Sequence, residues 1–249
     1  MTSPSERSRW LRNFTPAPNA PVKLVCFPHA GGSASYYFPL ARALSPEFDV
    51  YAVQYPGRQE RHSEPFVDNI DDLADCITEA LGDLPEAPLA FFGHSMGAVL
   101  AFEVTRRLEE TGRSPAVAFV SGSRAPSRYT DDGKSGTDAD LIQVMRDLGG
   151  TDPRVLGDRE LLDTFLPPFR NDFRALATYH RGPEIGVRAP LVVLTATDDP
   201  KTSEADARAW DRHTTAPVEV HTFTGGHFYL EKQAPRVIDV IAQKLRTLG

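Results

Sequence analysis

Short apolar runs alternate with longer amphipathic stretches along most of this chain. Short runs rich in branched and aromatic residues are typical of buried strands, whereas apolar residues three or four positions apart predict helices. The segments expected to form strands are 22–27, 48–54, 88–92, 116–120, 191–195 and 218–223. Those expected to form helices are 37–44, 70–81, 99–108, 203–212 and 232–245. Strands that alternate with helices predict an α/β fold, in which a mostly parallel central sheet has helices on both faces.

A helical block interrupts this alternation between about residues 124 and 186, where we find no convincing strand. Its expected helices begin at the capping-box-like pair Thr137 and Asp140, cover about 158–166 until Pro167-Pro168, and continue from Phe169 to Tyr179. We interpret the block as a lid inserted at the carboxyl ends of the strands, where such sheets bind their ligands. We therefore expect one domain over residues 1–249, with the helical lid insertion at about 124–186.

The composition and the net charge narrow the classes of protein to which this chain can belong. Its 249 residues, of which 41% are hydrophobic, are enough for one domain with a large core. The net charge of −7 argues against broad binding to nucleic acid.

The first 20 residues are polar and lack the apolar core of a signal peptide. We expect them to form a loose arm held by Trp10, Leu11 and Phe14.

The sequence carries no sign of a membrane segment or of a disulfide framework. No apolar run approaches the roughly 18–20 residues that a membrane helix needs, so we expect no membrane association and a cytoplasmic protein. Cys26 lies in an expected strand and Cys76 in an expected helix, where each would be a small buried hydrophobe. A disulfide or a reactive thiol is the alternative. We also expect a monomer.

The sequence Gly93-His94-Ser95-Met96-Gly97 lies between an expected strand and an expected helix. In that context the G-x-S-x-G pattern predicts a nucleophile elbow, a tight turn that presents a serine hydroxyl at the top of a sheet. The positions two before and two after the serine must lack side chains, and Gly93 and Gly97 meet that requirement. The free N–H groups of the following helix would face incoming negative charge. The alternative is an ordinary glycine-rich turn.

A serine nucleophile needs a histidine base, and that base needs an orienting carboxylate. In this type of fold the chain order is serine, acid, histidine. His227 lies in the loop after the last expected strand, next to Gly225 and Gly226. The acid should follow the preceding strand, where Asp198 and Asp199 both stand. We favour Asp199 because it lies further out into the loop, and we expect Asp198 to be a turn or capping residue.

The negative charge that develops on an attacked carbonyl oxygen requires backbone N–H donors. One donor should belong to the residue after the nucleophile, Met96, and the other to the loop after the first strand of the parallel run. We choose Ala30, in the loop 29–32, as that second donor. The loop lacks phosphate-binding spacing and the chain lacks metal-ligand spacings, so we expect no metal and no cofactor of its own.

Together these residues predict a serine hydrolase with the α/β-hydrolase fold. Ser95 would attack an acyl carbonyl, His227 would move the proton to the leaving group, and Asp199 would hold the histidine ring. Water would then cleave the acyl-enzyme. The alternatives are a general carboxylesterase or lipase with the same triad, an acyltransferase, and, least favoured, a binding protein without chemistry.

Four segments resemble motifs of the type II thioesterases, the stand-alone editing enzymes that accompany polyketide synthases and nonribosomal peptide synthetases. They are FPHAGGS at 27–33, YPGR at 55–58, GHSMG at 93–97 and GGHF at 225–228. The resemblance, which runs from about Trp10 to the C-terminus, implies hydrolysis of aberrant or stalled acyl groups from a phosphopantetheine thiol. It implies acyl or peptidyl carrier proteins and small acyl thioesters as partners, with the phosphopantetheine supplied by the substrate. It places the family's triad and oxyanion donors on Ser95, Asp199, His227, Ala30 and Met96.

Two further expectations accompany the resemblance, and one departure from the family pattern limits it. The family has a glycine where this chain has Thr197, which leaves the choice between Asp198 and Asp199 open. Aromatic residues of the helical block would cap an acyl pocket, the alternative being ordinary packing, and they are Phe165, Phe169, Phe173 and Tyr179. Because carrier proteins are usually acidic, a basic entrance is also considered, against scattered solvated arginines, at Arg58, Arg61, Arg124, Arg128, Arg170 and Arg174.

Overall fold

The structure, a computed structural model, describes residues 9–129 and 136–249 and has a seven-stranded sheet at its centre. The strand order is β1-β3-β2-β4-β5-β6-β7. The strands are β1 Leu11–Asn13, β2 Lys23–Phe27, β3 Asp49–Val53, β4 Leu89–His94, β5 Val117–Ser121, β6 Leu191–Ala196 and β7 Val218–Phe223. Neighbouring strands pair in parallel, except β1 and β3, which are antiparallel. The expected α/β fold with a mostly parallel sheet is confirmed.

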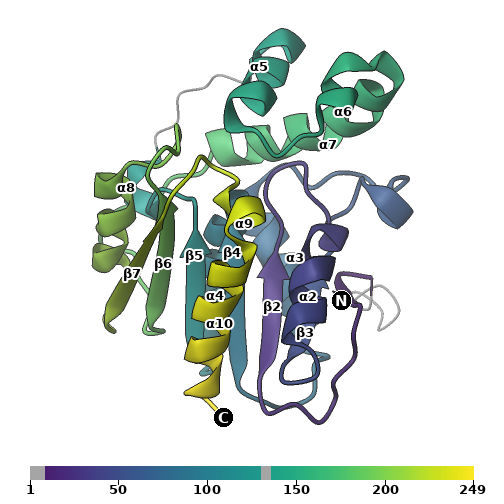
Figure 1. The fold of residues 1–249 in the computed structure, drawn as a ribbon. Coiled ribbons are helices and arrows are strands. Elements are labelled where there is room, and N and C mark those ends of the chain that lie inside the picture. The colour runs from purple at the N-terminus through teal and green to yellow at the C-terminus, as the bar shows by residue number, and fades with distance from the viewer. Residues whose placement is uncertain (1–8, 130–135) are drawn as a thin grey trace.

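Helices cover both faces of this sheet. They are α2 Phe38–Leu44, α3 Ile70–Leu81, α4 Met96–Glu110, α8 Glu204–Arg208, α9 Tyr229–Lys232 and α10 Ala234–Arg246. Short 3-10 turns cover Ala34–Tyr37, Gln59–Arg61, Pro126–Arg128 and Ala209–His213. The helix expected at 203–212 is therefore a short α-helix that passes into a 3-10 turn. Figure 1 places α2 and α10 on the near face of the sheet and α3 and α4 behind it.

Strand β1 belongs to the segment that we expected to be a loose arm. Leu11 pairs with Val53 of β3. Trp10 is buried, and the Arg61 guanidinium lies 4.3 Å from the centre of its ring. The expectation is wrong for Leu11–Asn13, because a three-residue strand is too short to produce an alternating pattern. Residues 1–8 of the expected arm lie outside the described residues.

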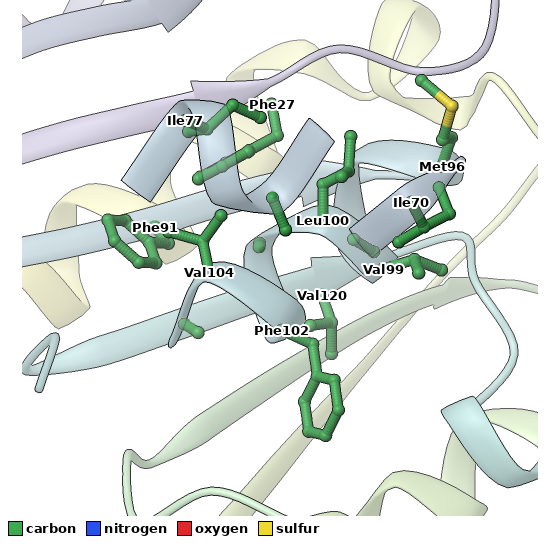
Figure 2. Packing of buried hydrophobic residues seen from close by; sticks show 14 of the residues in the cluster. Phe27, Ile70, Ile77, Phe91, Met96, Val99, Leu100, Phe102, Val104 and Val120 are labelled. Atoms are coloured by element: carbon green, nitrogen blue, oxygen red, sulfur yellow. The ribbon is translucent and has the colours of Figure 1, made fainter. Parts of the chain in front are cut away.

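The side chains of each strand point alternately to the two faces of the sheet, and each face has its own apolar cluster. Val25 and Phe91 belong to the cluster that packs against α3 and α4, part of which Figure 2 shows. Leu24 and Phe92 belong to the cluster that packs against α2 and α10. Because both faces are covered, the central strands are buried throughout, which explains their continuous apolar runs.

The helical block lies above the carboxyl ends of the strands, as Figure 1 shows. Its helices are α5 Asp138–Leu148, α6 Pro153–Gly157 and α7 Arg159–Ala177. The expected helix start at Thr137 is confirmed, because the Thr137 side chain accepts from the Asp140 N–H and the Asp140 side chain accepts from the Thr137 N–H.

Helix α7 runs through Pro167 and Pro168, where we expected a helix to stop. That expectation is wrong. Each proline removes a backbone donor and crowds the preceding turn. The helix nevertheless buries Leu166, Phe169 and Asp172. Burial of these side chains stabilises the helix across the prolines, and rules that consider only neighbouring residues do not include that contribution.

Candidate active site

Ser95 stands between β4 and α4 in a backbone conformation that few residues other than glycine adopt. Its φ is +56° and its ψ is −118°, which is the strained turn expected of a nucleophile elbow. Its N–H donates to the carbonyl oxygen of Ser121 in β5 at 2.8 Å. A Cβ on Gly93 would lie 2.0 Å from the carbonyl oxygen of Gly97, so this position accepts only glycine. The turn geometry predicted from the motif is present.

His227 lies in the loop after β7 and contacts Asp199 in the loop after β6. The distance from His227 Nδ1 to Asp199 Oδ2 is 2.9 Å, and both side chains are buried. Asp199 Oδ1 also accepts from the Lys201 N–H at 2.8 Å, which fixes the carboxylate. The Asp198 side chain instead accepts from the Thr197 hydroxyl at 2.9 Å. Of the two aspartates, the structure therefore places Asp199 on the histidine ring.

The loop after β2 lines the same cavity as Ser95 and His227. Its Gly32 N–H donates to the His29 carbonyl at 2.9 Å, and its Gly31 N–H donates to Asp172 Oδ2 at 2.8 Å. Ala30 precedes these two held amides and also lines the cavity. Met96 is the first residue of α4, so its N–H has no acceptor within the helix. This arrangement suits Ala30 and Met96 as the donors of an oxyanion hole, the role that we predict for them.

The cavity above Ser95 has a volume of about 430 Å³ and lies between the sheet and the lid. Helices α5 and α7 contribute apolar side chains to it, and those of α7 are Phe165, Phe169 and Phe173. A cavity of this size, mostly apolar with a few polar groups, is typical of a small-molecule site. The structure thus brings these phenylalanines to the predicted nucleophile.

Tyr179 lies outside this cavity, which corrects the expectation that it binds an acyl group. Its side chain is buried, and its hydroxyl donates to Glu103 Oε1 of α4 at 2.9 Å. Its ring packs edge-on against Tyr129, with ring centres 5.5 Å apart. Tyr179 comes after α7 has ended at Ala177, so the helical spacing that relates the phenylalanines no longer sets its direction.

Two further histidines, His29 and His94, lie near Ser95, and burial lowers the pKa of both. The His94 ring centre lies 4.9 Å from that of His227, and its Nδ1 lies 2.9 Å from the Ser121 hydroxyl. Burial lowers the pKa of His29 to about 3, and the positive charge of Arg58 adds to the effect. Burial lowers the pKa of His94 as well. Of these rings, His227 is the one that contacts a carboxylate.

Arg58 and Arg61 are buried, so the expected basic entrance is wrong for both of them. Arg61 donates to the Gln54 carbonyl at 2.7 Å. Arg58 pairs with Asp172 of α7, a carboxylate that the sequence analysis did not single out. The signal was present, because an acidic residue at a buried position on a helix is uncommon unless it is paired.

Residues 9–129 and 136–249 offer neither a metal site nor a membrane-spanning helix. They contain no group of three or more His, Cys, Asp or Glu side chains that could hold a metal ion. None of their helices is both long and apolar enough to cross a membrane.

The chain resembles known proteins over nearly its whole length. The model of the Thioesterase domain family matches residues 22–245. The chain is 46% identical over 245 residues to a probable cadicidin biosynthesis thioesterase of Streptomyces griseus, covering 98% of this chain and 68% of that protein. The solved structure of the type II thioesterase BorB from the borrelidin biosynthetic cluster has a TM-score of 0.87 and 44% identity, covering 94% and 97% of the two chains. YbtT, a type II thioesterase from the yersiniabactin NRPS/PKS pathway, has a TM-score of 0.81 and 33% identity, covering 96% and 98%.

Proposed function

We propose a substrate and a mechanism for this chain on the premise that it belongs to the thioesterase family. The chain is a thioester hydrolase. We infer that it releases aberrant or stalled acyl groups from the phosphopantetheine thiol of acyl or peptidyl carrier proteins in polyketide or nonribosomal peptide biosynthesis. Its likeness to BorB and YbtT over more than nine-tenths of the chain supports this substrate, since both are type II thioesterases of such pathways.

One observation carries the mechanism: Ser95 and the His227–Asp199 pair meet at one cavity. With Nδ1 of His227 occupied by Asp199, Nε2 is the nitrogen that can take the Ser95 proton. Ser95 Oγ then bonds to the thioester carbonyl carbon, and the carbonyl oxygen takes up the negative charge. The N–H groups of Ala30 and Met96 stabilise that oxyanion.

Collapse of the tetrahedral intermediate breaks the carbon–sulfur bond and returns the carbonyl. The leaving thiol takes its proton from His227, and a thiol with a pKa of about 8.5 leaves more readily than an alcohol, so modest acid assistance suffices. A water molecule, deprotonated by His227, then attacks the acyl-enzyme and releases the free carboxylic acid with Ser95 restored.

The lid supplies the acyl-binding part of the site. Phe165, Phe169 and Phe173 offer apolar surface to an acyl chain within the cavity of about 430 Å³. The thin phosphopantetheine arm would enter from solvent with its carrier protein. The substrate carries this group, so we propose that the chain acts without a cofactor of its own. We further propose that it is a cytoplasmic monomer. Light scattering of the purified protein tests the oligomeric state.

A panel of acyl-carrier proteins tests the proposal. Acetyl, propionyl and longer acyl groups are loaded on one carrier protein, and free acid release is followed with the wild-type chain and with Ser95→Ala. We expect release by the wild type and none above background by Ser95→Ala. A matched thioester and oxygen ester of the same acid are run in parallel, and a strong preference for the oxygen ester would favour a carboxylesterase instead.

Two controls separate the remaining alternatives. A fluorophosphonate probe should label Ser95 in the wild type, and absence of labelling would leave only a binding function. Alcohols or amines are also added to the assay. Ester or amide products in place of free acid would identify an acyltransferase.

A further inference from the structure

Asp172 is a carboxylate on lid helix α7 with a side chain that is fully buried. Arg58 donates to both of its oxygens, through Nη1 to Oδ2 at 2.6 Å and through Nη2 to Oδ1 at 2.9 Å. Such a two-point contact fixes the relative orientation of the two groups. Arg58 Nη1 also donates to the Gly32 carbonyl at 3.1 Å. The pair therefore joins α7 to the loop after β2.

The same carboxylate holds the loop directly. The Gly31 N–H donates to Asp172 Oδ2 at 2.8 Å. Gly31 has a φ of +73°, and a Cβ added to it would lie 2.9 Å from the Phe169 ring, so α7 also packs closely over this residue. The peptide next to Ala30 is thus held by a hydrogen bond from one α7 residue and covered by the side chain of another.

A structural role alone explains this arrangement poorly. Burying an ion pair gains little stability on average, because the cost of removing two charges from water offsets their attraction. Apolar residues of similar size would join a lid helix to a loop equally well. The carboxylate does what they could not, since it accepts a hydrogen bond from a specific backbone amide and so sets the rotation of the loop peptide beside Ala30.

We propose that the Asp172–Arg58 pair is a positioning device through which lid helix α7 sets the oxyanion loop. Ala30 presents its N–H to the reacting carbonyl when α7 is seated and Asp172 holds the Gly31 amide. The proposal rests on the proposed function, because it takes Ala30 as an oxyanion donor. It makes the lid part of the catalytic geometry as well as a wall of the acyl cavity.

The first test compares two carboxylates of the lid. Asp172→Asn keeps the shape of the side chain but replaces one acceptor oxygen with an NH2 group. Whichever way the amide lies, that NH2 group meets an N–H of Arg58, so the two-point contact that holds Asp172 is lost. Asp138→Asn is the matched control, because Asp138 also pairs with an α7 arginine, Arg170, but is exposed. With hexanoyl-N-acetylcysteamine as substrate, we expect Asp172→Asn to lower kcat by about 10- to 100-fold, with KM within about threefold. Asp138→Asn should leave both unchanged.

A second measurement isolates the oxyanion hole. A hexanoyl trifluoromethyl ketone forms a bond from Ser95 Oγ to its carbonyl carbon, the serine proton passes to His227, and the carbonyl oxygen becomes an oxyanion. Its inhibition constant should rise in Asp172→Asn by the factor by which kcat falls. The affinity for hexan-1-ol, which fills the acyl cavity but has no carbonyl to become an oxyanion, should not change. If Asp172 only stabilised the fold, neither kcat nor the inhibition constant would change in the folded variant.

The double variant Arg58→Met/Asp172→Leu tests the proposal in a protein that should fold even if Asp172→Asn does not. Apolar replacement of both partners preserves folding in many proteins, yet it leaves the Gly31 amide without its acceptor. We expect a wild-type-like melting temperature with the same loss in kcat. Wild-type kcat in either folded variant would overturn the proposal. If the wild type hydrolysed no thioester, the proposed function would fail, while the inhibition constants would still decide the positioning role.

Discussion

Gly97 and Phe27 are in backbone contact, since a Cβ on Gly97 would lie 1.9 Å from the Phe27 carbonyl oxygen. Gly97 is in the first turn of α4, directly after the nucleophile turn, and Phe27 is the last residue of β2. The loop with Ala30 begins one residue later. The absence of a side chain at Gly97 therefore lets the nucleophile turn and the oxyanion loop come together.

This contact predicts that Gly97→Ala is strongly destabilising. The new methyl group would meet a backbone carbonyl that cannot move without shifting β2, and overpacking of this kind costs about 1–3 kcal/mol or more. Gly157→Ala, in α6, is the control, because a Cβ there meets nothing within 4 Å. Urea unfolding should show a lower midpoint for Gly97→Ala and an unchanged or slightly higher one for Gly157→Ala. Equal midpoints for both variants would contradict the steric argument.

The two adjacent aspartates predict kinetic effects of very different size. Asp199→Asn should lower kcat on a small thioester by about 10³-fold or more, because the His227 ring loses the partner that sets its tautomer and stabilises its charge. Asp198→Asn should change kcat by less than about threefold, because its carboxylate contacts the Thr197 hydroxyl and not the ring. Steady-state kinetics of the two variants decide the assignment, and a larger loss in Asp198→Asn would reverse it.

The buried His29 predicts a loss of stability in mild acid. Its pKa is lowered from 6.5 to about 3 in the folded chain, chiefly by burial. Above pH 6.5 neither state binds this proton. As the pH falls below 6.5, the unfolded chain binds a proton on this histidine and the folded chain does not. The free energy of unfolding therefore decreases until the pH approaches 3.

At pH 5 this histidine alone should reduce the free energy of unfolding by about 2 kcal/mol. His29→Phe keeps the aromatic packing against Tyr36 and Phe228 and removes the titrating group. Urea unfolding at pH 7.5 and pH 5.0 should therefore give a smaller pH-dependent loss for His29→Phe than for the wild type. An identical loss in both would mean that His29 is protonated in the folded chain.

The lining of the cavity predicts that Phe165 limits acyl size. Its side chain lines the cavity but remains 45% exposed, so truncation should cost little stability. Phe165→Ala should raise the ratio of kcat/KM for long over short acyl thioesters by about tenfold. Leu161→Ala is the control on the same helix, since Leu161 is similarly exposed and does not line the cavity. An equal shift in the two variants would assign the effect to lid stability.

Local patterns were sufficient for the strands β2 to β7 and for the nucleophile turn. Strands β2, β4, β5 and β6 were predicted because each is buried on both faces and therefore appears as a mostly apolar run. Strand β3 and the largely exposed β7 were predicted from the β-favouring residues that recur along them. The turn at Ser95 was predicted because its steric requirements are met within five residues of chain. The positions of Asp199 and His227 followed from the loops in which they stand, because parallel strands bring their carboxyl ends to one edge.

Other features depend on contacts between residues far apart in the sequence. The course of α7 through Pro167 and Pro168 depends on what the helix packs against, and the turn of Tyr179 toward Glu103 depends on α4. Arg58 and Asp172 are separated by 114 positions, and nothing near either of them indicates the other.

The sequence by itself determined which residues could perform the chemistry, because strand burial, turn sterics and loop order are local properties that a chain carries in its own pattern. The tertiary structure alone decided how the lid meets that chemistry. The Gly31 amide, the Asp172 carboxylate and the Arg58 guanidinium come from three segments, and only the packed chain brings them within hydrogen-bond distance. Hydrogen bonds depend on distance and direction in space, and the sequence specifies these only through the whole fold.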